Sequence, residues 1–472
     1  MALIATVAVV IGIIGLFVLE RDAKARPSMA LFIPLLWLLI NGSRPVSQWL
    51  QMGVTTDTME SANAILDGSP LDASVFTALL AIALVVVIWR GQKVVALLRG
   101  NPLIVLFFLY CLVSVAWSDY PFVAFKRWTK AIGDLAMVLI ALTDPVRETA
   151  LKRLLAWIGF LLMPVSVLFI KYYPDLGRGY SRWDGTLFNT GVTTNKNTLG
   201  MICMIVGLGA LWRVFHMLRA KKSARPTKQL IAQASLLGFV LWLLWLCNSM
   251  TSLSCFLMGS SLIVATSFPT LVRKRAVLHL LVVAALAVSS SALFFDLGGD
   301  VLKTMGRDTT LTGRTDVWNA VLHMTQNPIL GAGFESFWLG PRLDKLWSMF
   351  WWHPNEAHNG YLEVFLNLGW VGIALLTSII ITGYRNLLSM LRWNPEACGL
   401  RMAFFVAALA YNFTEAGFRI MSPVWIFFLV AAVAVPKPRV AKAAEKGEAE
   451  KTNLWSEVPA PVPVGAHHLR HI

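Results

Sequence analysis

The stretch "HPNEAHNGYLEVFLNLGWVG", residues 353–372, places polar side chains directly before an apolar run that continues to Thr382. A histidine exchanges a proton near neutral pH, so His353 and His358 are candidate general bases. The structural alternative is a histidine that caps the following helix or binds a backbone carbonyl. A neighbouring array of cations would favour catalysis, because a base beside positive charge suits attack of a hydroxyl on a phosphate-activated centre.

One such array lies in residues 171–200, "KYYPDLGRGYSRWDGTLFNTGVTTNKNTLG". Guanidinium and ammonium groups bind phosphate, pyrophosphate or an acidic sugar. Contact with lipid headgroups, or pairing with the two aspartates of the segment, explains the same charges equally well. The candidate residues are Lys171, Arg178, Arg182, Lys196 and Asn197.

A third segment, residues 313–338, reads "GRTDVWNAVLHMTQNPILGAGFESFW". Val317, Val321 and Leu322 have helical spacing, which predicts an amphipathic helix on the outer surface. Arg314 at its start is a candidate functional cation, with a salt bridge to Asp316 or to a neighbouring loop as the structural alternative. Four tryptophans suit an interfacial aromatic belt; they are Trp338, Trp347, Trp351 and Trp352.

The elements that must position these residues are membrane helices. The chain is 57% hydrophobic and only 14% charged, whereas a soluble protein carries about a quarter charged residues. Its net charge of +15 comes from basic residues between apolar runs, which fits membrane topology better than nucleic-acid binding. The five cysteines have no metal-type spacing, and we interpret them as small buried hydrophobes.

A membrane span needs roughly 20 apolar residues, and the runs here are far longer than barrel strands. The sequence therefore predicts an all-α polytopic protein with about 12–13 spans. The first run is interpreted as a retained helix, not as a signal peptide. The predicted spans are 3–19, 29–42, 73–89, 103–117, 122–142, 154–170, 198–218, 230–247, 251–269, 276–294, 359–382, 402–416 and 421–435.

Loop charges alternate along the chain, and the positive-inside rule then assigns the sides. The outward loops include 171–197 and the large loop 295–358 between spans 10 and 11; the amino terminus is also outside. Residues 1–435 form the membrane domain, and the Pro- and charge-rich tail 436–472 is expected to be cytoplasmic and disordered. The basic, inward loops are 20–28, 90–101, 143–153, 219–229, 270–276 and 383–401.

Several catalytic signatures are absent from the sequence: a P-loop, G-x-S-x-G, H-E-x-x-H and an outward D-x-D pair that would hold a metal for a nucleotide-sugar donor. A nucleotide-fuelled reaction on the outer face is excluded on location, because the nucleotide is cytoplasmic. The sequence therefore predicts a donor that is already activated and membrane-bound.

Together these segments resemble the bacterial O-antigen ligase and polymerase superfamily. "HNGYLEVFLNLGWVG" is similar to its signature of a histidine, a polar residue and two small residues, here His358, Asn359, Gly369 and Gly372. "GRTDVWNAVLHMTQNPILGAGFESF" and "RWDGTLFNTGVTTNKNTLG" resemble its arginine loops, and "SVAWSDYPFVAFKRWTKAIGDL" and "NFTEAGF" also look typical. The resemblance covers most of the chain except the tail, and is closest to the ExoQ-like exopolysaccharide polymerase branch.

The resemblance implies a GT-C-like, inverting, metal-independent glycosyltransferase without a cofactor. Such an enzyme takes a glycan from undecaprenyl pyrophosphate at the periplasmic face of the bacterial inner membrane and joins it to an acceptor hydroxyl. A chain-length-regulating co-polymerase is a family-level partner. Carried over, Arg182 and Arg314 neutralise the leaving pyrophosphate, and His358 orients or deprotonates the acceptor, which leaves His353 as structural.

The resemblance also implies a supporting set around these three residues. Arg178 is the alternative to Arg182 as the first functional arginine. One departure from the pattern is Trp318 at the fourth position after Arg314, where ligases often have leucine. The remaining candidates, for the phosphate or the acceptor, are Lys196, Asn197, Asn359 and Glu415.

Two alternatives remain. A ligase that transfers a finished glycan to lipid A core, or a protein O-oligosaccharyltransferase, differs from a polymerase only in its acceptor. A transporter or flippase for lipid-linked sugars should carry charges in the middle of its spans. Here the middles are mostly apolar, with 126–134 as the main exception, so the outer-loop charges favour catalysis.

Overall fold

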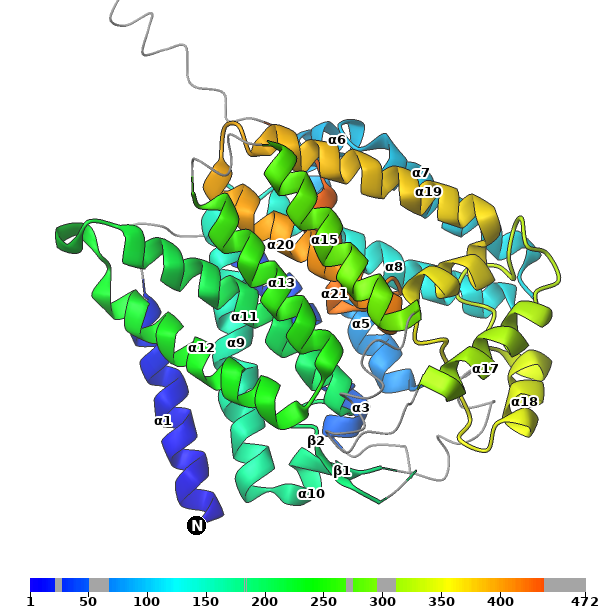
Figure 1. Cartoon of the computed structure of the whole chain (residues 1–472), viewed down its shortest axis with the longest axis horizontal. Helices are drawn as coiled ribbons and strands as arrows, with labels where there is room; N and C mark the ends of the chain where they lie inside the picture. The colour runs from blue at the N-terminus through cyan, green and yellow to red at the C-terminus, as the bar shows by residue number, and fades with distance from the viewer. Residues whose placement is uncertain are drawn as a thin grey trace, which may run out of the picture. The chain divides into compact units, whose positions relative to one another are not determined.

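The computed structural model places helices on every predicted span (Figure 1). It describes residues 1–21, 28–50, 68–181, 183, 185–268, 275–294 and 311–436. The helices of the amino-terminal half are α1 (Ala2–Glu20), η1 (Met29–Leu31), α2 (Phe32–Asn41), α3 (Val46–Trp49), α5 (Pro70–Trp89), α6 (Gly91–Arg99), α7 (Pro102–Val113), η3 (Ser114–Trp117), α8 (Pro121–Leu142) and α9 (Arg147–Tyr172).

The carboxy-terminal half continues in the same manner. Its helices are α10 (Pro174–Gly177), α11 (Lys196–Arg219), η4 (Lys222–Ala224), α12 (Thr227–Cys247), α13 (Met250–Thr266), α15 (Arg275–Phe294), α17 (Leu311–His323), α18 (Gly340–Met349), α19 (Gly360–Met390), α20 (Pro395–Thr414) and α21 (Pro423–Ala432). The amphipathic helix predicted in the large loop is confirmed as α17, whereas α18 was not predicted.

Seven described helices are each long and apolar enough to cross a membrane, and an eighth span results if the pair bent by 94° at residues 91–117 is one span. The chain is therefore a polytopic helical membrane protein, as predicted. The basic connector 90–101 is itself largely helical, as α6, which the sequence did not reveal. The number of 12–13 spans stays a prediction, because α2, α13 and α21 are shorter than a full span.

The described part of the outward loop 171–197 contains one small β-hairpin. Strand β1 (Arg178–Tyr180) pairs antiparallel with β2 (Leu187–Asn189), and Arg178 lies opposite Asn189. Arg44, between α2 and α3, donates hydrogen bonds to the carbonyls of Gly191 (3.3 Å) and Thr193 (3.2 Å). Burial lowers the pKa of Arg44.

Loops that were predicted to share a side of the membrane contact one another. On the basic side, Glu396 pairs with Lys152 of another basic loop at 3.8 Å and lies 3.9 Å from His216, near the end of α11. On the other side, Thr251 at the start of α13 bonds Thr414 at the end of α20 at 2.8 Å. Both contacts join residues that the alternation of loop charges places on the same side of the membrane.

The long helices pack against one another through small residues. Helix α11 lies beside α9, α12 and α13, and α20 lies between α13 and α21 (Figure 1). A side chain at Gly207 of α11 would come within 2.7 Å of Val240 in α12. Small residues allow such close approach of helices in a lipid environment, where van der Waals packing is a main source of association.

Helix α19 is broken at Gly369, whose φ of 62° and ψ of −163° are not helical. Backbone groups freed by the break must be satisfied within the protein, and the segment 327–332 supplies the partners. The bonds are Trp370 N to Pro328 O at 2.9 Å, Val371 N to Ile329 O at 3.2 Å and Ala332 N to Leu366 O at 3.0 Å. The glycine thus joins the large loop to the helix that follows it.

Replacement of this glycine should destabilise the protein. A Cβ at Gly369 would lie 2.2 Å from the Ile329 carbonyl oxygen, and its positive φ disfavours any other residue. We expect Gly369→Ala to cost at least about 2 kcal/mol. The measurement is the thermal unfolding temperature of the purified protein in detergent, and Gly238→Ala is the control because a Cβ there meets nothing within 4 Å. Equal unfolding temperatures in the two variants would contradict the packing described here.

Candidate active site

Glu415, directly after α20, is the residue on which the candidate site is centred. Its side chain is buried, with 7% of the residue exposed. Its Oε1 accepts hydrogen bonds from Asn197 Nδ2 (3.0 Å) and Arg314 (3.4 Å). Its Oε2 lies 3.2 Å from Nδ1 of His358. The start of α11, the start of α17 and the loop before α19 therefore meet at one carboxylate.

His358 lies between two carboxylates. Its Nδ1 is 3.0 Å from Oε1 of Glu356 as well as 3.2 Å from Glu415. With Nδ1 held in this way, Nε2 is the ring nitrogen that can meet a reactant, and the side chain is 40% exposed. The arrangement of a carboxylate, an imidazole and an open ring nitrogen is the one by which a histidine acts as a base.

Two guanidinium groups balance these carboxylates. Arg314 pairs with Glu415 and also donates to the carbonyl of Thr414. Arg419, four residues after Glu415, pairs with Glu356. The structural alternative for Arg314, a salt bridge to a neighbouring loop, is thus present, and the same contact holds the guanidinium beside His358.

The pKa values of the histidine and its partner shift in opposite directions. Burial lowers the pKa of His358, but the hydrogen bonds and negative charges of Glu356 and Glu415 outweigh burial and raise it to about 9. Burial raises the pKa of Glu356, but the bond from His358 and the positive charges of Arg419 and Arg314 lower it to about 2. At neutral pH, His358 and Glu356 therefore form an ion pair of an imidazolium and a carboxylate.

Residue types around the histidine explain its position. Asn359 caps α19, because its Oδ1 accepts hydrogen bonds from the backbone of Tyr361 and Leu362, each at 3.0 Å. Its Nδ2 donates to the Phe413 carbonyl at 3.2 Å. The cap therefore joins the start of α19 to the end of α20. The resemblance assigned the Asn359 side chain to substrate binding, but here both ends of its amide bond the backbone.

The next residue, Gly360, tightens the same junction. Its backbone N–H donates to the carbonyl of Glu415 at 3.1 Å, and a Cβ on it would lie 1.7 Å from Oδ1 of Asn412. A residue larger than glycine at position 360 would therefore collide with the Asn412 side chain of α20. The sequence His-Asn-Gly thus places the imidazole, the cap and the close approach in consecutive positions.

The structure brings together four of the predicted site residues and separates others. His358, Arg314, Asn197 and Glu415 form one group through the contacts above. Arg178 instead donates to the Ile170 carbonyl at 2.9 Å.

The other predicted residues lie apart from the group or outside the description. Lys196 is exposed at the start of α11, and Arg182 lies outside the described residues. His353 is exposed and stacks on Trp347 at 4.7 Å, in agreement with a structural role.

Glu356 and Arg419 belong to the site but were not among the predicted residues. Glu356 lies within the polar cluster before α19, two residues from His358, so its carboxylate could have been included on proximity. Arg419 follows "NFTEAGF" by one residue. Only the fold shows that this arginine reaches Glu356.

A metal ion has one candidate site in the described part of the chain. The ligand atoms of Glu356, His358 and Glu415 all lie within 4.8 Å of one another. Both carboxylates, however, already pair with guanidinium groups, and a divalent cation would be repelled by those two positive charges. The donor set fits a charge-balanced acid–base group better than a metal centre.

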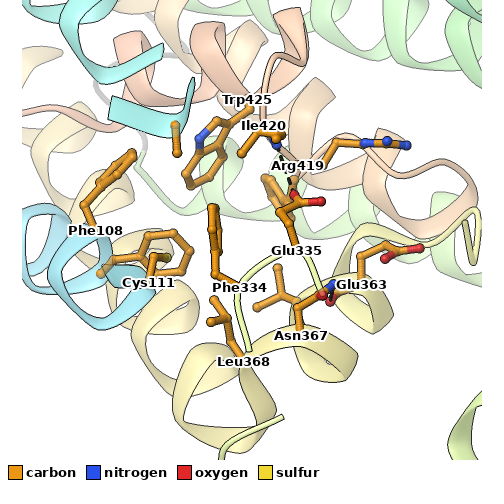
Figure 2. A pocket seen from close by; sticks show the side chains of 14 residues that line it. Phe108, Cys111, Phe334, Glu335, Glu363, Asn367, Leu368, Arg419, Ile420 and Trp425 are labelled. Atoms are coloured by element: carbon orange, nitrogen blue, oxygen red, sulfur yellow. Dashed lines mark hydrogen bonds between the residues drawn. The ribbon is translucent and has the colours of Figure 1, made fainter. Parts of the chain in front are cut away.

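Arg419 is also one of the residues that line a small cavity (Figure 2). The charged side chains at its wall are Glu335, Glu363 and Arg419, and aromatic rings such as Phe334 and Trp425 line another side. The buried Glu363 accepts hydrogen bonds from Nε1 of Trp338 (2.8 Å) and from the backbone of Ala357 (2.5 Å). The bond to Ala357 fixes the residue next to His358, so this network positions the histidine.

Comparison with known proteins confirms the predicted resemblance. Residues 198–377 match the family model described as O-antigen ligase, a range that includes Arg314 and His358. The chain is also similar to the exopolysaccharide production protein ExoQ of Rhizobium meliloti (strain 1021), at 25% identity over 380 residues, which are 76% of this chain and 81% of that protein.

The ion pair with Glu356 predicts that His358 loses its proton at high pH, and that Glu356→Gln lowers this pH. Removal of the Glu356 charge removes a stabilising partner of the imidazolium, so Glu356→Gln should shift the pKa of His358 from about 9 toward its ordinary value. Diethyl pyrocarbonate modifies neutral imidazole, and its rate at His358, followed by peptide mass spectrometry, gives the midpoint. Asp316→Asn, at an exposed carboxylate on α17, is the control. An unchanged midpoint in Glu356→Gln would refute the pairing.

The same two pKa shifts determine how the stability of the fold depends on pH. The folded pKa of His358 is above its ordinary value of 6.5, so its contribution is complete below pH 6.5 and is lost as pH rises through 9. The folded pKa of Glu356 is below its ordinary value of 4.5, so its contribution is complete above that pH and is lost as pH falls toward 2. Together, the two groups stabilise the fold most between pH 4.5 and 6.5.

Proposed function

We propose that the protein is a glycosyltransferase that polymerises undecaprenyl-pyrophosphate-linked oligosaccharide repeat units at the periplasmic face of the bacterial inner membrane. The observation that carries this proposal is the group of His358, Arg314 and Glu415, in which a base and a cation share one buried carboxylate. The match to the O-antigen ligase family and the similarity to an exopolysaccharide production protein support a function in polysaccharide biosynthesis.

In the proposed reaction the acceptor hydroxyl attacks the anomeric carbon of the donor sugar from the side opposite the pyrophosphate. The new C–O bond forms while the bond to the pyrophosphate oxygen breaks, and that oxygen leaves with the electron pair, so the anomeric configuration is inverted. Arg314 stabilises the negative charge that develops on the leaving group, a role that a rigid guanidinium can perform without a metal ion.

His358 takes the hydroxyl proton through Nε2. A pKa of about 9 means that the imidazolium formed in this step is stabilised by Glu356 and Glu415. The neutral form must be present for the proton to be accepted, so the rate should increase as pH rises from 7 toward 9. In the charged form the same ring adds a positive charge beside the leaving pyrophosphate.

The difference between the two ends of the helices supports the proposed location of the site. Two basic loops meet at the Lys152–Glu396 pair at one end of the helices, and the candidate site lies at the other end. Basic loops face the cytoplasm, so the site faces the periplasm, where a lipid-linked donor presents its pyrophosphate at the membrane surface.

A ligase is the second candidate, because the matching family model is described as O-antigen ligase. A ligase transfers a finished glycan to lipid A core, and a protein O-oligosaccharyltransferase transfers it to a protein. All three reactions use the same donor and the same chemistry, so they differ in what accumulates when the enzyme is lost.

Replacement of the base or the cation should abolish polymer formation while the protein still inserts. Loss of one charge-stabilising contact typically costs on the order of 3 kcal/mol of barrier, or a factor of about a hundred. In a deletion strain complemented with Arg314→Ala or His358→Ala, we expect no high-molecular-weight glycan. The matched controls are Arg392→Ala and His323→Ala, which alter exposed residues outside the site. Wild-type glycan length in both site variants would remove the assignment.

The lipid-linked intermediates of the same strains separate polymerase from ligase. A polymerase variant accumulates single repeat units on the lipid carrier, because they cannot be joined. A ligase variant accumulates long lipid-linked polymer, because joining continues and only the final transfer fails. Single units are the expected result, and long lipid-linked chains would assign the ligase.

A further inference from the structure

Two exposed tryptophans from different loops meet beside the candidate site. Trp183, in the turn between β1 and β2, is 63% exposed, and Trp351, after α18, is 61% exposed. Their ring centroids are 4.9 Å apart at an angle of 71°. Trp352 joins them, 4.9 Å from Trp183. We call these three residues the tryptophan platform.

The platform borders the start of α17. A Cβ at Gly313 would lie 3.9 Å from the ring of Trp352, and Gly313 directly precedes Arg314 in the chain. The backbone that carries the catalytic guanidinium therefore lies against the platform, and the exposed rings continue the surface that begins at the site.

Of the four tryptophans of the large loop predicted to form an interfacial belt, Trp338 is buried, and the belt stays a prediction for the other three. Trp338 is 8% exposed and donates to Glu363. Trp347 donates to the carbonyl of Pro354 at 3.1 Å and stacks on His353. Trp352 packs against Phe350 at 4.9 Å. Trp347 and Trp352 are half-buried in these contacts, and Trp351 is the most exposed of the four rings.

Exposed tryptophans on the long helices offer a contrast. Trp89 of α5 is 84% exposed and Trp245 of α12 is 74% exposed, as expected for rings in contact with lipid. The exposed rings of the platform instead lie on a hairpin turn and a loop, beside the start of α17. Adjacent exposed aromatic surface in such a place marks a binding site.

We propose that the tryptophan platform binds the sugar rings of the acceptor glycan and so directs its terminal hydroxyl toward His358. The apolar C–H face of a sugar ring can stack on an indole, and this contact requires no charge. The platform and the charged group then divide the substrates: the guanidinium binds the pyrophosphate, and the indoles bind uncharged sugar. This inference rests on the proposed function.

Binding of a soluble glycan tests the platform separately from catalysis. The probe is a mixture of oligosaccharide fragments from the polysaccharide that the host cell itself secretes, titrated onto the full-length protein in lipid nanodiscs. Isothermal titration calorimetry, which does not depend on the rings that are removed, reports the binding. We expect saturable binding to the wild type, and an affinity at least about tenfold weaker in Trp183→Ala/Trp351→Ala.

Three controls give each result one meaning. Trp183→Phe/Trp351→Phe keeps aromatic faces and should retain most of the affinity, which separates stacking from a folding defect. Trp245→Ala removes an exposed ring from a long apolar helix and should bind as the wild type does. Arg314→Ala should still bind the fragments even though it forms no polymer, so failure of the platform and failure of the proposed function are distinguishable.

Wild-type affinity in the double alanine variant would overturn the inference. A membrane role for the platform is the other outcome that would do so. In that case brominated phospholipid in the nanodisc would quench more fluorescence in the wild type than in Trp183→Phe/Trp351→Phe, and the fragments would not protect against quenching. For a glycan platform, the two proteins should show the same lipid quenching.

Discussion

The buried carboxylate of Glu415 is the interaction on which the site depends. A carboxylate that is removed from water is stable only when it is paired and hydrogen-bonded. Here the partners come from three segments, because Asn197, Arg314 and His358 all bind the two oxygens. Satisfying one buried charge therefore brings two large loops and the ends of two helices to a single point, and that point has both a cation and a base.

Backbone hydrogen bonds connect the site to the helices α19 and α20. Asn359 and Gly360 fasten the beginning of α19 to the end of α20, so the packing of α20 determines where His358 lies. Further along α19, the break at Gly369 binds the segment 327–332, which connects α17 to α18. Gly369 of the signature thus has a structural role, because its break allows the loop that carries Arg314 and the helix that follows His358 to share backbone hydrogen bonds.

Local features of the sequence were predictable and long-range ones were not. Hydropathy is a local property, so the helices and α17 could be predicted, and the resemblance selected His358 and Arg314. The central role of Glu415 could not be seen, because its bond to Asn197 joins residues 218 positions apart. Charge alone does not identify the partner of a cation: Arg178 lies in a cationic loop, and it donates to the Ile170 carbonyl of its own segment. Arg419 was missed because only the turn between α20 and α21 directs it to Glu356.

The most direct test of this account is transfer by the purified protein when the central carboxylate is neutralised. Wild type and Glu415→Gln are reconstituted in proteoliposomes with the lipid-linked glycan extracted from a deletion strain, and release of polyprenyl pyrophosphate is measured. The account predicts a rate at least about a hundredfold lower in Glu415→Gln, because His358 and Arg314 lose the charge that holds both. Wild-type turnover in a Glu415→Gln protein with normal thermal stability would contradict it.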